Sequence, residues 1–410
     1  MSNVPLSQIL TDVNEGVRNS TTGSLSNGIR TRAINNTLED LQLEADWQWS
    51  RRTKTFYYIA GVSEYSLKNY VGATCLDKDG ASSILDIKTA YELRPVNNSS
   101  DKPLDENDAR QVGENIRRNK SIAEFAINQE KLIINYIRQS SSELHNCDSL
   151  TANGVVAAEG DAANLTIDSV IFSKGPGALN FDVVAGTSIE ISFTGIPNKD
   201  LTALQNKSHF TLDAWLPTIT GFTSIEFRIG SDASNYFTKT ETVPAGQADL
   251  AVGKNKFAFR WADATETGTP DVTALDYMKV IITYGSAITD TDFRLDDIRV
   301  AAEVEMELEY YSDATVKTAA GVYQLGFNDS AITQTDLLLG GTKSKPMVVL
   351  GSQYRLFKRL GGKSERDRTD TFDEYTNSKN KTMKAYGRKI KRTPHRILNF
   401  PSRRSGLRRY

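Results

Sequence analysis

Only a few residues of this chain are of the types that usually act as a catalytic base, a nucleophile or a soft metal ligand. His145, His209 and His395 lie far apart in the sequence, and none has a second ligand or base at a recognised spacing. Cys75 and Cys147 allow at most one disulfide bridge and cannot form a thiolate zinc site by themselves. Two free thiols in a reducing cytoplasm are the simplest interpretation.

The carboxylate pair Asp296–Asp297 is the one most worth considering as a cation site. Calcium takes six to eight oxygen ligands, so two adjacent side chains supply only part of a site. In a regular strand these side chains also point to opposite faces. We favour an ordinary polar strand edge over calcium, and a glycosidase dyad is less favoured still because adjacent positions cannot flank one bond from two sides.

The motifs of the common enzyme classes are absent from the sequence. There is no G-x-S-x-G, no H-E-x-x-H, no P-loop and no G-x-G-x-x-G that opens a helix. The sequence therefore predicts a protein that is not an enzyme, with no catalytic residue, no metal and no cofactor.

Both ends of the chain carry helical patterns. Apolar residues recur at spacings of three and four from Leu6 to Val17 and from Ile34 to Ala45, which predicts two amphipathic helices. Similar patterns predict helices over 346–360 and 370–390. Strands are predicted over 53–59, 64–67, 83–94 and 124–137. A short helix is predicted over 105–114, between the last two strands.

The composition changes near His145 to a region rich in Thr, Gly, Ala and aromatic residues. Segments 188–193, 210–215, 256–261 and 279–284 alternate apolar and polar residues, which predicts an all-β sandwich or barrel. After about residue 303 the composition returns to the charged, helix-favouring kind found before His145. A strand is predicted over Val304–Tyr311.

These patterns predict an α+β fold in which a helical domain with a small β-sheet is interrupted by an inserted all-β sandwich and followed by an extended basic C-terminal tail. The predicted boundaries are 1–145 and 304–392 for the interrupted domain, 146–303 for the sandwich and 393–410 for the tail.

The net charge of −2 conceals a basic C-terminal arm. From Lys379 onward there are twelve Lys or Arg and no Asp or Glu, so the remainder carries −14 (−2 minus 12). Such an arm usually contacts a polyanion or an acidic protein surface. No run of about 18 apolar residues occurs, and residues 1–20 have no signal-peptide pattern, so we expect no membrane partner and no conventional secretion.

Four segments follow one another near the N-terminus. They are an Arg-rich helical segment at Ile29–Asn35, the segment Glu44–Trp49, a strand, and a turn followed by a strand at Ile59–Leu67. In this order the segments resemble the N-terminal part of bacteriophage head-to-tail connector adaptors. Phe125–Ile134 is also similar, with Val304–Tyr311 as its expected hairpin partner, so that the sandwich would interrupt an adaptor domain inside a hairpin loop. The two predicted C-terminal helices resemble the closing helices of that family.

This resemblance implies a structural virion protein of the neck, made in the host cytoplasm. Such adaptors form a ring, commonly a dodecamer, that docks under the portal protein, contacts a downstream tail or nozzle protein and continues the channel for DNA ejection. Their C-terminal segment reaches the portal, and Thr393–Tyr410 is too poor in apolar residues to fold without a partner.

The tail offers arginines that can pair with portal carboxylates and apolar residues that can anchor it. The residues expected to dock are Arg396, Ile397, Leu398, Phe400, Arg403, Arg404, Leu407, Arg408 and Arg409. A solvated tail without an ordered partner, and non-specific contact with packaged DNA, are the alternatives.

The strand pattern of residues 147–302 and its close at Leu295–Val300 are similar to a carbohydrate-binding-module jelly roll. That resemblance implies a sugar site of exposed aromatic residues beside polar ones. The candidate glycan contacts are Trp215, Tyr236 and Trp261, with Tyr284 as a further aromatic residue. Alternation with apolar residues favours packing roles for both tryptophans, so a decoration that contacts capsid, tail or neighbouring subunits is favoured.

Three functions are therefore compared. A neck adaptor accounts for the helical ends, the insertion and the basic tail. A carbohydrate-binding adhesin, or another virion decoration, requires exposed aromatic residues, and a nucleic-acid-binding protein requires a basic folded face, whereas the chain before the basic arm is net acidic.

Overall fold

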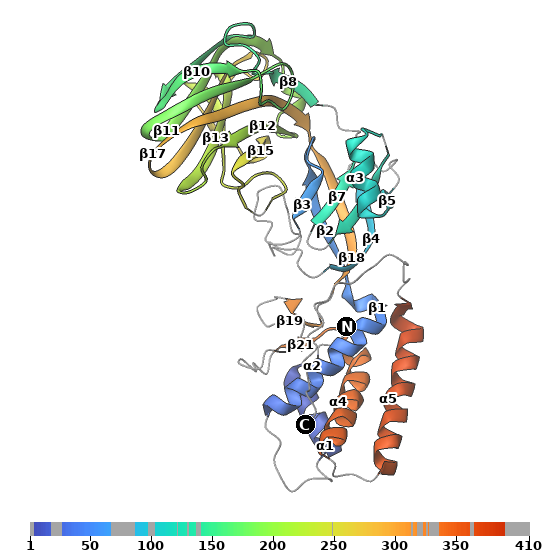
Figure 1. Cartoon of the computed structure of the whole chain (residues 1–410). Coiled ribbons are helices and arrows are strands. Elements are labelled where there is room, and N and C mark those ends of the chain that lie inside the picture. The colour runs from blue at the N-terminus through green and yellow to red at the C-terminus, as the bar shows by residue number, and fades with distance from the viewer. Residues whose placement is uncertain are drawn as a thin grey trace. The chain divides into compact units, whose positions relative to one another are not determined.

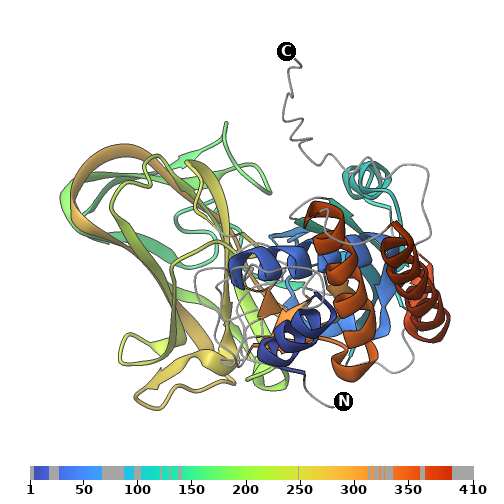
Figure 2. The ribbon, with the colours of Figure 1, turned by 90° about the horizontal axis from the view of Figure 1, so that it is seen from below.

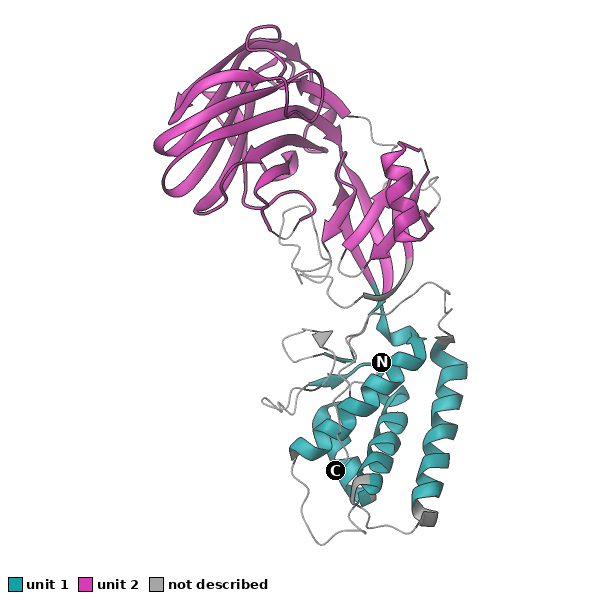
Figure 3. Cartoon of the chain, viewed as in Figure 1, with its two compact units in different colours: residues 1–52, 311–410 teal, residues 53–310 magenta. Residues whose placement is uncertain are grey.

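The computed structural model describes residues 4–17, 27–66, 87–96, 103–120, 122–128, 131–136, 141–247, 249–312, 315–317, 323–324, 327, 336–360 and 365–389. The chain divides into two compact units (Figure 3). Unit 1 comprises residues 1–52 and 311–410, and unit 2 comprises residues 53–310.

Unit 1 is built on helices from both ends of the chain. They are α1 (Leu6–Val17), α2 (Asn27–Glu44), α4 (Lys345–Leu360) and α5 (Glu365–Tyr386). α4 packs against the other three, and Figures 1 and 2 show it in orange beside the red α5. Their apolar faces share one core. The helices predicted from apolar spacing are confirmed, since each of these faces is the stripe of a 3.6-residue repeat.

Short strands complete unit 1. β1 (Ala45–Trp47) pairs antiparallel with β22 (Gly387–Lys389), and β19 (Val316–Lys317) lies between β20 (Tyr323–Gln324) and β21 (Leu337–Leu338). Trp47 stacks on Trp49 with ring centroids 4.8 Å apart, and its Nε1 donates to the Leu41 carbonyl at 2.8 Å.

Unit 2 begins with two small sheets and one helix. One sheet has the order β2 (Arg51–Tyr58), β18 (Val304–Ser312), β4 (Ile87–Pro95). The other has the order β3 (Glu64–Ser66), β7 (Lys131–Asn135), β6 (Glu124–Asn128), β5 (Asp105–Glu106). Helix α3 (Ala109–Arg117) starts at Asp108, whose side chain accepts from the Arg110 amide at 2.9 Å, as an N-cap does.

The predicted pairing of Phe125–Ile134 with Val304–Tyr311 is wrong. β6 and β7 form their own hairpin, with Phe125 opposite Ile134, whereas β18 lies between β2 and β4. Closing so short a loop costs little conformational entropy, so the local hairpin forms in preference to a pairing across a long insertion.

The rest of unit 2 is a β-sandwich (Figure 1). Its strands are β8 (Ser141–His145), β9 (Val155–Gly160), β10 (Ala162–Asp168), β11 (Ala178–Lys199), β12 (Ser208–Leu216), β13 (Phe222–Asp232), β14 (Asn235–Glu241), β15 (Gly253–Arg260), β16 (Thr265–Thr267) and β17 (Leu275–Ala302). The alternating segments named in the sequence overlap four of these strands, β11, β12, β15 and β17.

β17 takes part in both layers of the sandwich. Its first part pairs with β11 and β13, and the first layer continues to β14 and β16 on one side and β9 on the other. Its second part pairs with β12, which pairs with β15, and with β8. Between the layers lies an aromatic and aliphatic core, where Phe181 stacks on Phe293 at 5.8 Å and Phe227 on Phe259 at 5.5 Å.

The predicted fold class is wrong. Strands make up 50% of the described residues and helices 27%, so this part of the chain is mostly β and not a helical adaptor domain with a small sheet. Two strands alone, β11 and β17, contribute 22 and 28 residues. The helical periodicity of the chain ends was easier to recognise than these long strands, which are broken by bulges and turns.

The domain boundaries predicted from the sequence, at residues 145, 303 and 392, stay predictions. Along the chain, the two compact units meet at other positions, 52/53 and 310/311. The predicted tail, 393–410, and the strand residues 83–86 lie outside the described residues.

Gly340 is the residue of unit 1 whose substitution tests the packing around Trp49. It adopts φ +83°, and a Cβ there would lie 2.9 Å from Trp49 Cδ2 and 2.8 Å from Ser344 Oγ. We expect Gly340→Ala to lower the free energy of unfolding of unit 1 by about 2 kcal/mol, from backbone strain and the clash. Gly28→Ala, in α2 with nothing near its Cβ, should be neutral or stabilising by up to about 1 kcal/mol. Calorimetry on both variants checks this, and equal melting temperatures would contradict it.

Candidate binding face of the β-sandwich

The outer surface of the first layer carries polar and aromatic side chains in rows across the strands. In an antiparallel sheet directly opposed residues share a face. One row runs Thr194, Tyr277, Gly230, Tyr236, Thr267, and the next runs Ser192, Lys279, Arg228, Thr238. The intervening residues, such as Phe227 and Val280, are buried in the core. We call this surface, with Glu159, Glu190 and Glu226 of the third row, the β13 face.

Lys279 is the centre of one charged cluster on the β13 face. Its Nζ lies 2.7 Å from Glu159 Oε2 and 2.5 Å from Glu190 Oε2, and Ser192 Oγ donates to Glu159 at 2.6 Å. Partial burial lowers the pKa of Lys279, but the hydrogen bonds to the two glutamates outweigh it and the net shift is upward. The hydrogen bonds from Lys279 and Ser192 lower the pKa of Glu159. The Lys279 ammonium and the Glu159 carboxylate are thus held charged and oriented.

Arg228 is the centre of a second cluster. Its Nε donates to Glu226 Oε1 at 2.5 Å, and its guanidinium carbon lies 4.8 Å from the centroid of the Tyr236 ring. This is cation–π geometry. Tyr277 is only 6% exposed, and burial raises the pKa of its phenol, so it is a neutral hydroxyl that can donate or accept.

Gly230 separates the two tyrosines within their row. A Cβ at this position would lie 2.1 Å from the Asn235 carbonyl oxygen and 2.7 Å from Tyr236 Cβ. No larger residue fits without moving β14, so the row has aromatic residues on either side of a position that has no side chain.

The β13 face combines the two kinds of group that recognise a polyhydroxylated ligand. Fixed carboxylates, an ammonium and a guanidinium provide acceptors and donors at defined positions, and the partly exposed Tyr236 provides a ring surface, whereas Tyr277 is largely buried beside it. Because the charged groups are already paired, they are pre-organised before any ligand arrives.

The structure does not bring the sequence-predicted glycan contacts together. Trp261 lies in the core at 1% exposure, 4.9 Å from Phe210 and 5.3 Å from Phe237 by ring centroids. Tyr284 is also buried and donates to the Thr218 carbonyl at 2.7 Å. Tyr236 lies on the β13 face, whereas Trp215 lies on the opposite outer surface.

That opposite surface belongs to the second layer, and we call it the β12 face. Its residues on β12 are His209, Thr211, Asp213 and Trp215, which alternate with the buried Phe210, Leu212 and Ala214. Part of this face packs within unit 2 against β2, since Arg260 lies 4.4 Å over the Tyr57 ring and donates to its hydroxyl at 3.0 Å. It is therefore less available than the β13 face.

Several residues of the β13 face were missed by sequence reasoning. Arg228, Lys279 and Tyr277 occupy the polar positions of alternating segments, which was the available signal. These side chains lie close together because of the register in which β13 pairs with β17. The two strands are some fifty residues apart in the chain, and no local sequence pattern specifies that register.

The pair Asp296–Asp297 does not alternate as predicted. The register shifts at this point and Asp297 has φ +54°, so both carboxylates reach the β12 face. Asp296 is fully buried and accepts from the amides of Ser173 at 2.5 Å, Lys174 at 3.0 Å and Asp297 at 2.6 Å. Burial raises its pKa to about 7.

The neighbours of this pair are cations of the chain itself. Asp213 forms ion pairs with Lys254 and Lys256, both at 2.9 Å, and Asp297 pairs with Lys256 at 3.8 Å and with Arg299. Within the described residues, no group of three or more His, Cys, Asp or Glu could hold a metal ion. His209 and His145 are buried, and burial lowers their pKa to about 3 and about 4.

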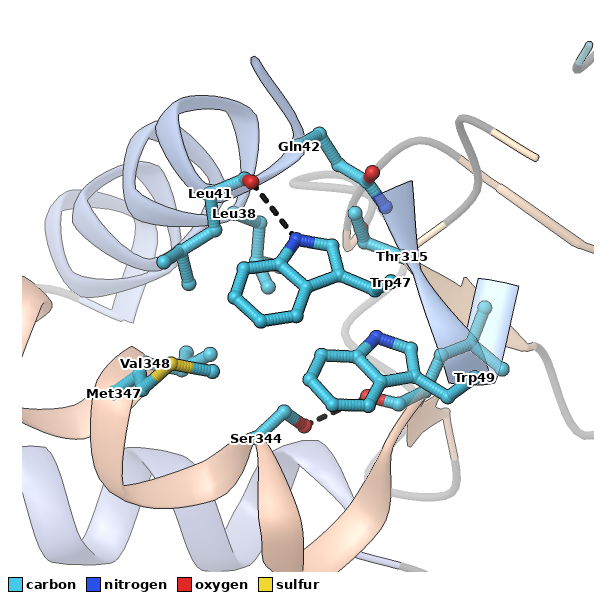
Figure 4. A pocket seen from close by; sticks show the side chains of 10 residues that line it. Leu38, Leu41, Gln42, Trp47, Trp49, Thr315, Ser344, Met347 and Val348 are labelled. Atoms are coloured by element: carbon cyan, nitrogen blue, oxygen red, sulfur yellow. Dashed lines mark hydrogen bonds between the residues drawn. The ribbon is translucent and has the colours of Figure 1, made fainter. Parts of the chain in front are cut away.

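Unit 1 holds a small pocket (Figure 4). Its lining is mainly apolar, with Trp47, Trp49 and Met347 prominent. Its Ser344 hydroxyl already donates to the Leu339 carbonyl at 2.7 Å. The pocket offers few free polar groups to orient a ligand, so it is a weaker candidate than the β13 face. The predicted docking residues between Arg396 and Arg409 lie outside the described residues.

No protein-family model matches the chain, and no curated protein does. Similar solved structures include a family 11 carbohydrate-binding module from Clostridium thermocellum in complex with a β-1,3-1,4-mixed-linked tetrasaccharide, at 12% identity and TM-score 0.29, covering 39% of this chain and 94% of that one. A family 30 module of a C. thermocellum cellulosomal cellulase is 13% identical, with TM-score 0.29 and coverage of 40% and 98%. An exo-β-agarase is 12% identical, with TM-score 0.28 and coverage of 39% and 25%. These values identify no family.

Asp296 should be a principal structural carboxylate of the sandwich. We expect Asp296→Ala to lower the free energy of unfolding of unit 2 by about 2 to 4 kcal/mol, because three backbone amides lose their acceptor. The matched control is Asp292→Ala on the same strand, where an exposed side chain pairs with Arg294 at 3.3 Å and the loss should stay below about 1 kcal/mol. Chemical denaturation of the full chain measures both. Equal decreases in the free energy of unfolding for the two variants would contradict a structural role for Asp296 beyond that of an exposed carboxylate.

Proposed function

We propose that this protein is a non-enzymatic binding protein and that the β13 face of its sandwich recognises carbohydrate. The observation that supports this best is the row in which Tyr277 and Tyr236 flank Gly230, directly beside the paired cations Lys279 and Arg228. A sugar ring presents hydroxyls at its edge and C–H groups on its faces. The first need hydrogen bonds of defined direction and the second need ring surfaces, and this face supplies both.

The charge of the face favours a neutral glycan. Two cations, Arg228 and Lys279, stand with three carboxylates, Glu159, Glu190 and Glu226, and every cation is paired. An acidic polysaccharide or a nucleic acid would face a surplus of negative charge, because the local sum is +2 − 3 = −1. A neutral oligosaccharide meets no such repulsion.

Removing the Arg228 side chain should abolish most of the binding to glycans. Arg228→Ala loses donors on the face and the support of Tyr236, so we expect the affinity of the full chain for neutral oligosaccharides to fall by about tenfold or more. Glycan-array binding followed by calorimetric titration measures it. Trp215→Ala, on the opposite face, is the control and should bind as the parent chain does. A parent chain that binds no neutral glycan, or a loss caused only by Trp215→Ala, would refute the proposal.

A neck adaptor is a second candidate function, and the architecture of unit 1 favours it. Helices from both chain ends share one core, and unit 2 is inserted between them in the sequence. A ring protein of a virion with an inserted decoration would have this order along the chain. In this function copies of the chain form a ring, commonly of twelve, under the portal, and the sandwich becomes a carbohydrate-binding decoration at the head-to-tail interface.

The adaptor function predicts a specific dependence on the C-terminal tail. Truncation at Thr393 should abolish co-sedimentation with the cognate portal while the melting temperature of the remaining chain is unchanged, because the basic segment has too few apolar residues to form a core. Native mass spectrometry of the full chain with the portal should show a ring of the portal's copy number. Retained docking by the truncated chain would exclude the tail mechanism.

A further inference from the structure

The loop between β10 and β11 exposes three consecutive apolar side chains. Val170 is 84% exposed, Ile171 41% and Phe172 40%. Scattered exposed apolar residues need no explanation, but a consecutive run at a loop end is unusual for a soluble surface. We call these three residues the apolar tip.

The apolar tip is held in place by two carboxylates. Asp168 Oδ1 accepts from the amides of Val170 at 2.7 Å and Ile171 at 3.3 Å, while its Oδ2 accepts from Arg294 Nε at 2.7 Å. Just beyond the tip, the buried Asp296 accepts from the Ser173 and Lys174 amides. Both ends of the tip are therefore fixed by hydrogen bonds to the sandwich, and the exposure of its side chains is built into the fold.

The charges around the tip are exposed unequally. The side chains of Lys174 and Lys254 are 54% and 46% exposed, whereas those of Asp168, Asp213 and Asp297 are 14%, 2% and 14% exposed. Two acids here are exposed as well: Glu143, at 42%, pairs with Arg299 at 3.1 Å and with Lys174 at 3.9 Å, and Asp292, at 61%, pairs with Arg294 at 3.3 Å. A ligand that meets this surface encounters ammonium groups before most of the carboxylates.

Trp215 belongs to the same surface. Lys254 Nζ lies 5.3 Å from the Trp215 ring and 2.5 Å from Ser173 Oγ, which places this indole beside the loop that carries the tip. Tryptophan and lysine beside aliphatic residues is the composition of protein surfaces that lie at the boundary between lipid headgroups and acyl chains.

We propose that the apolar tip, with Trp215, Lys174 and Lys254 around it, docks on the surface of a lipid bilayer that contains anionic headgroups. The tip protrudes and needs no matching cavity, because acyl chains adapt to its shape, and the exposed lysines complement the negative surface potential. The contact is peripheral: no helix of the described residues is long and apolar enough to cross a membrane. This proposal departs from the sequence-based expectation of no membrane partner, which rested on the lack of a long apolar run and of a signal-peptide pattern.

Flotation of the full chain with vesicles tests this proposal. We expect binding to phosphatidylcholine vesicles that contain phosphatidylglycerol and much weaker binding to phosphatidylcholine alone. The double variant Ile171→Asp/Phe172→Asp should lose on the order of tenfold in partitioning, since two inserted apolar side chains become charged. Val184→Asp is the matched control, because Val184 is 63% exposed elsewhere on β11 and should have no role.

The variants should fold normally, since the altered side chains are exposed, and equal melting temperatures check this. Absence of flotation by the parent chain, or equal flotation by the double variant, would overturn the proposal. So would tip-dependent self-association of the chain in the absence of vesicles, which would make a second copy the occupant of this surface. Arg228→Ala should float as the parent chain does, which separates this contact from glycan binding.

Discussion

The long strand β17 is shared by both layers of the sandwich, and the positions of all other sandwich strands depend on its register. Its first part fixes β11 and β13, and its second part fixes β12 and β8. Since the side chains of a strand alternate, each pairing decides which residues face outward. A shift of one residue in β17 would bury Lys279 and expose Val280, so the aromatic core and the β13 face depend on the same pairing.

The ion pairs on the two outer surfaces of the sandwich have different structural roles. The β12 face carries ion pairs and buried carboxylates that fasten loops, as Asp296 does for the segment after the apolar tip, and it packs in part against β2 through Arg260 and Tyr57. The β13 face has ion pairs that hold side chains in place without fastening a loop. Among those groups the Glu159 side chain is 45% exposed and the Arg228 side chain 26%, and these partly exposed groups are why we assign carbohydrate recognition to this face.

Local patterns in the sequence predicted much of the secondary structure. The spacing of Leu6, Ile9 and Val13 gave α1, and the alternation around Phe257 gave β15. Patterns could not give the balance of the fold, because the pairing partners of β11, β17 and β18 are distant in the chain. For the candidate site, the local alternation favoured a packing role for Trp261, and its burial confirms that prediction. The irregularity at Asp297 was not predictable in this way, and it places on one face two carboxylates that were expected on opposite faces.

A structure of the full chain solved with a neutral oligosaccharide bound would test the central claim most directly. The account predicts sugar rings on the β13 face, against Tyr236, with hydroxyls that accept from Arg228 and donate to its neighbouring glutamates. Sugar bound on the β12 face beside Trp215, or no ordered sugar at concentrations that saturate binding in solution, would contradict it.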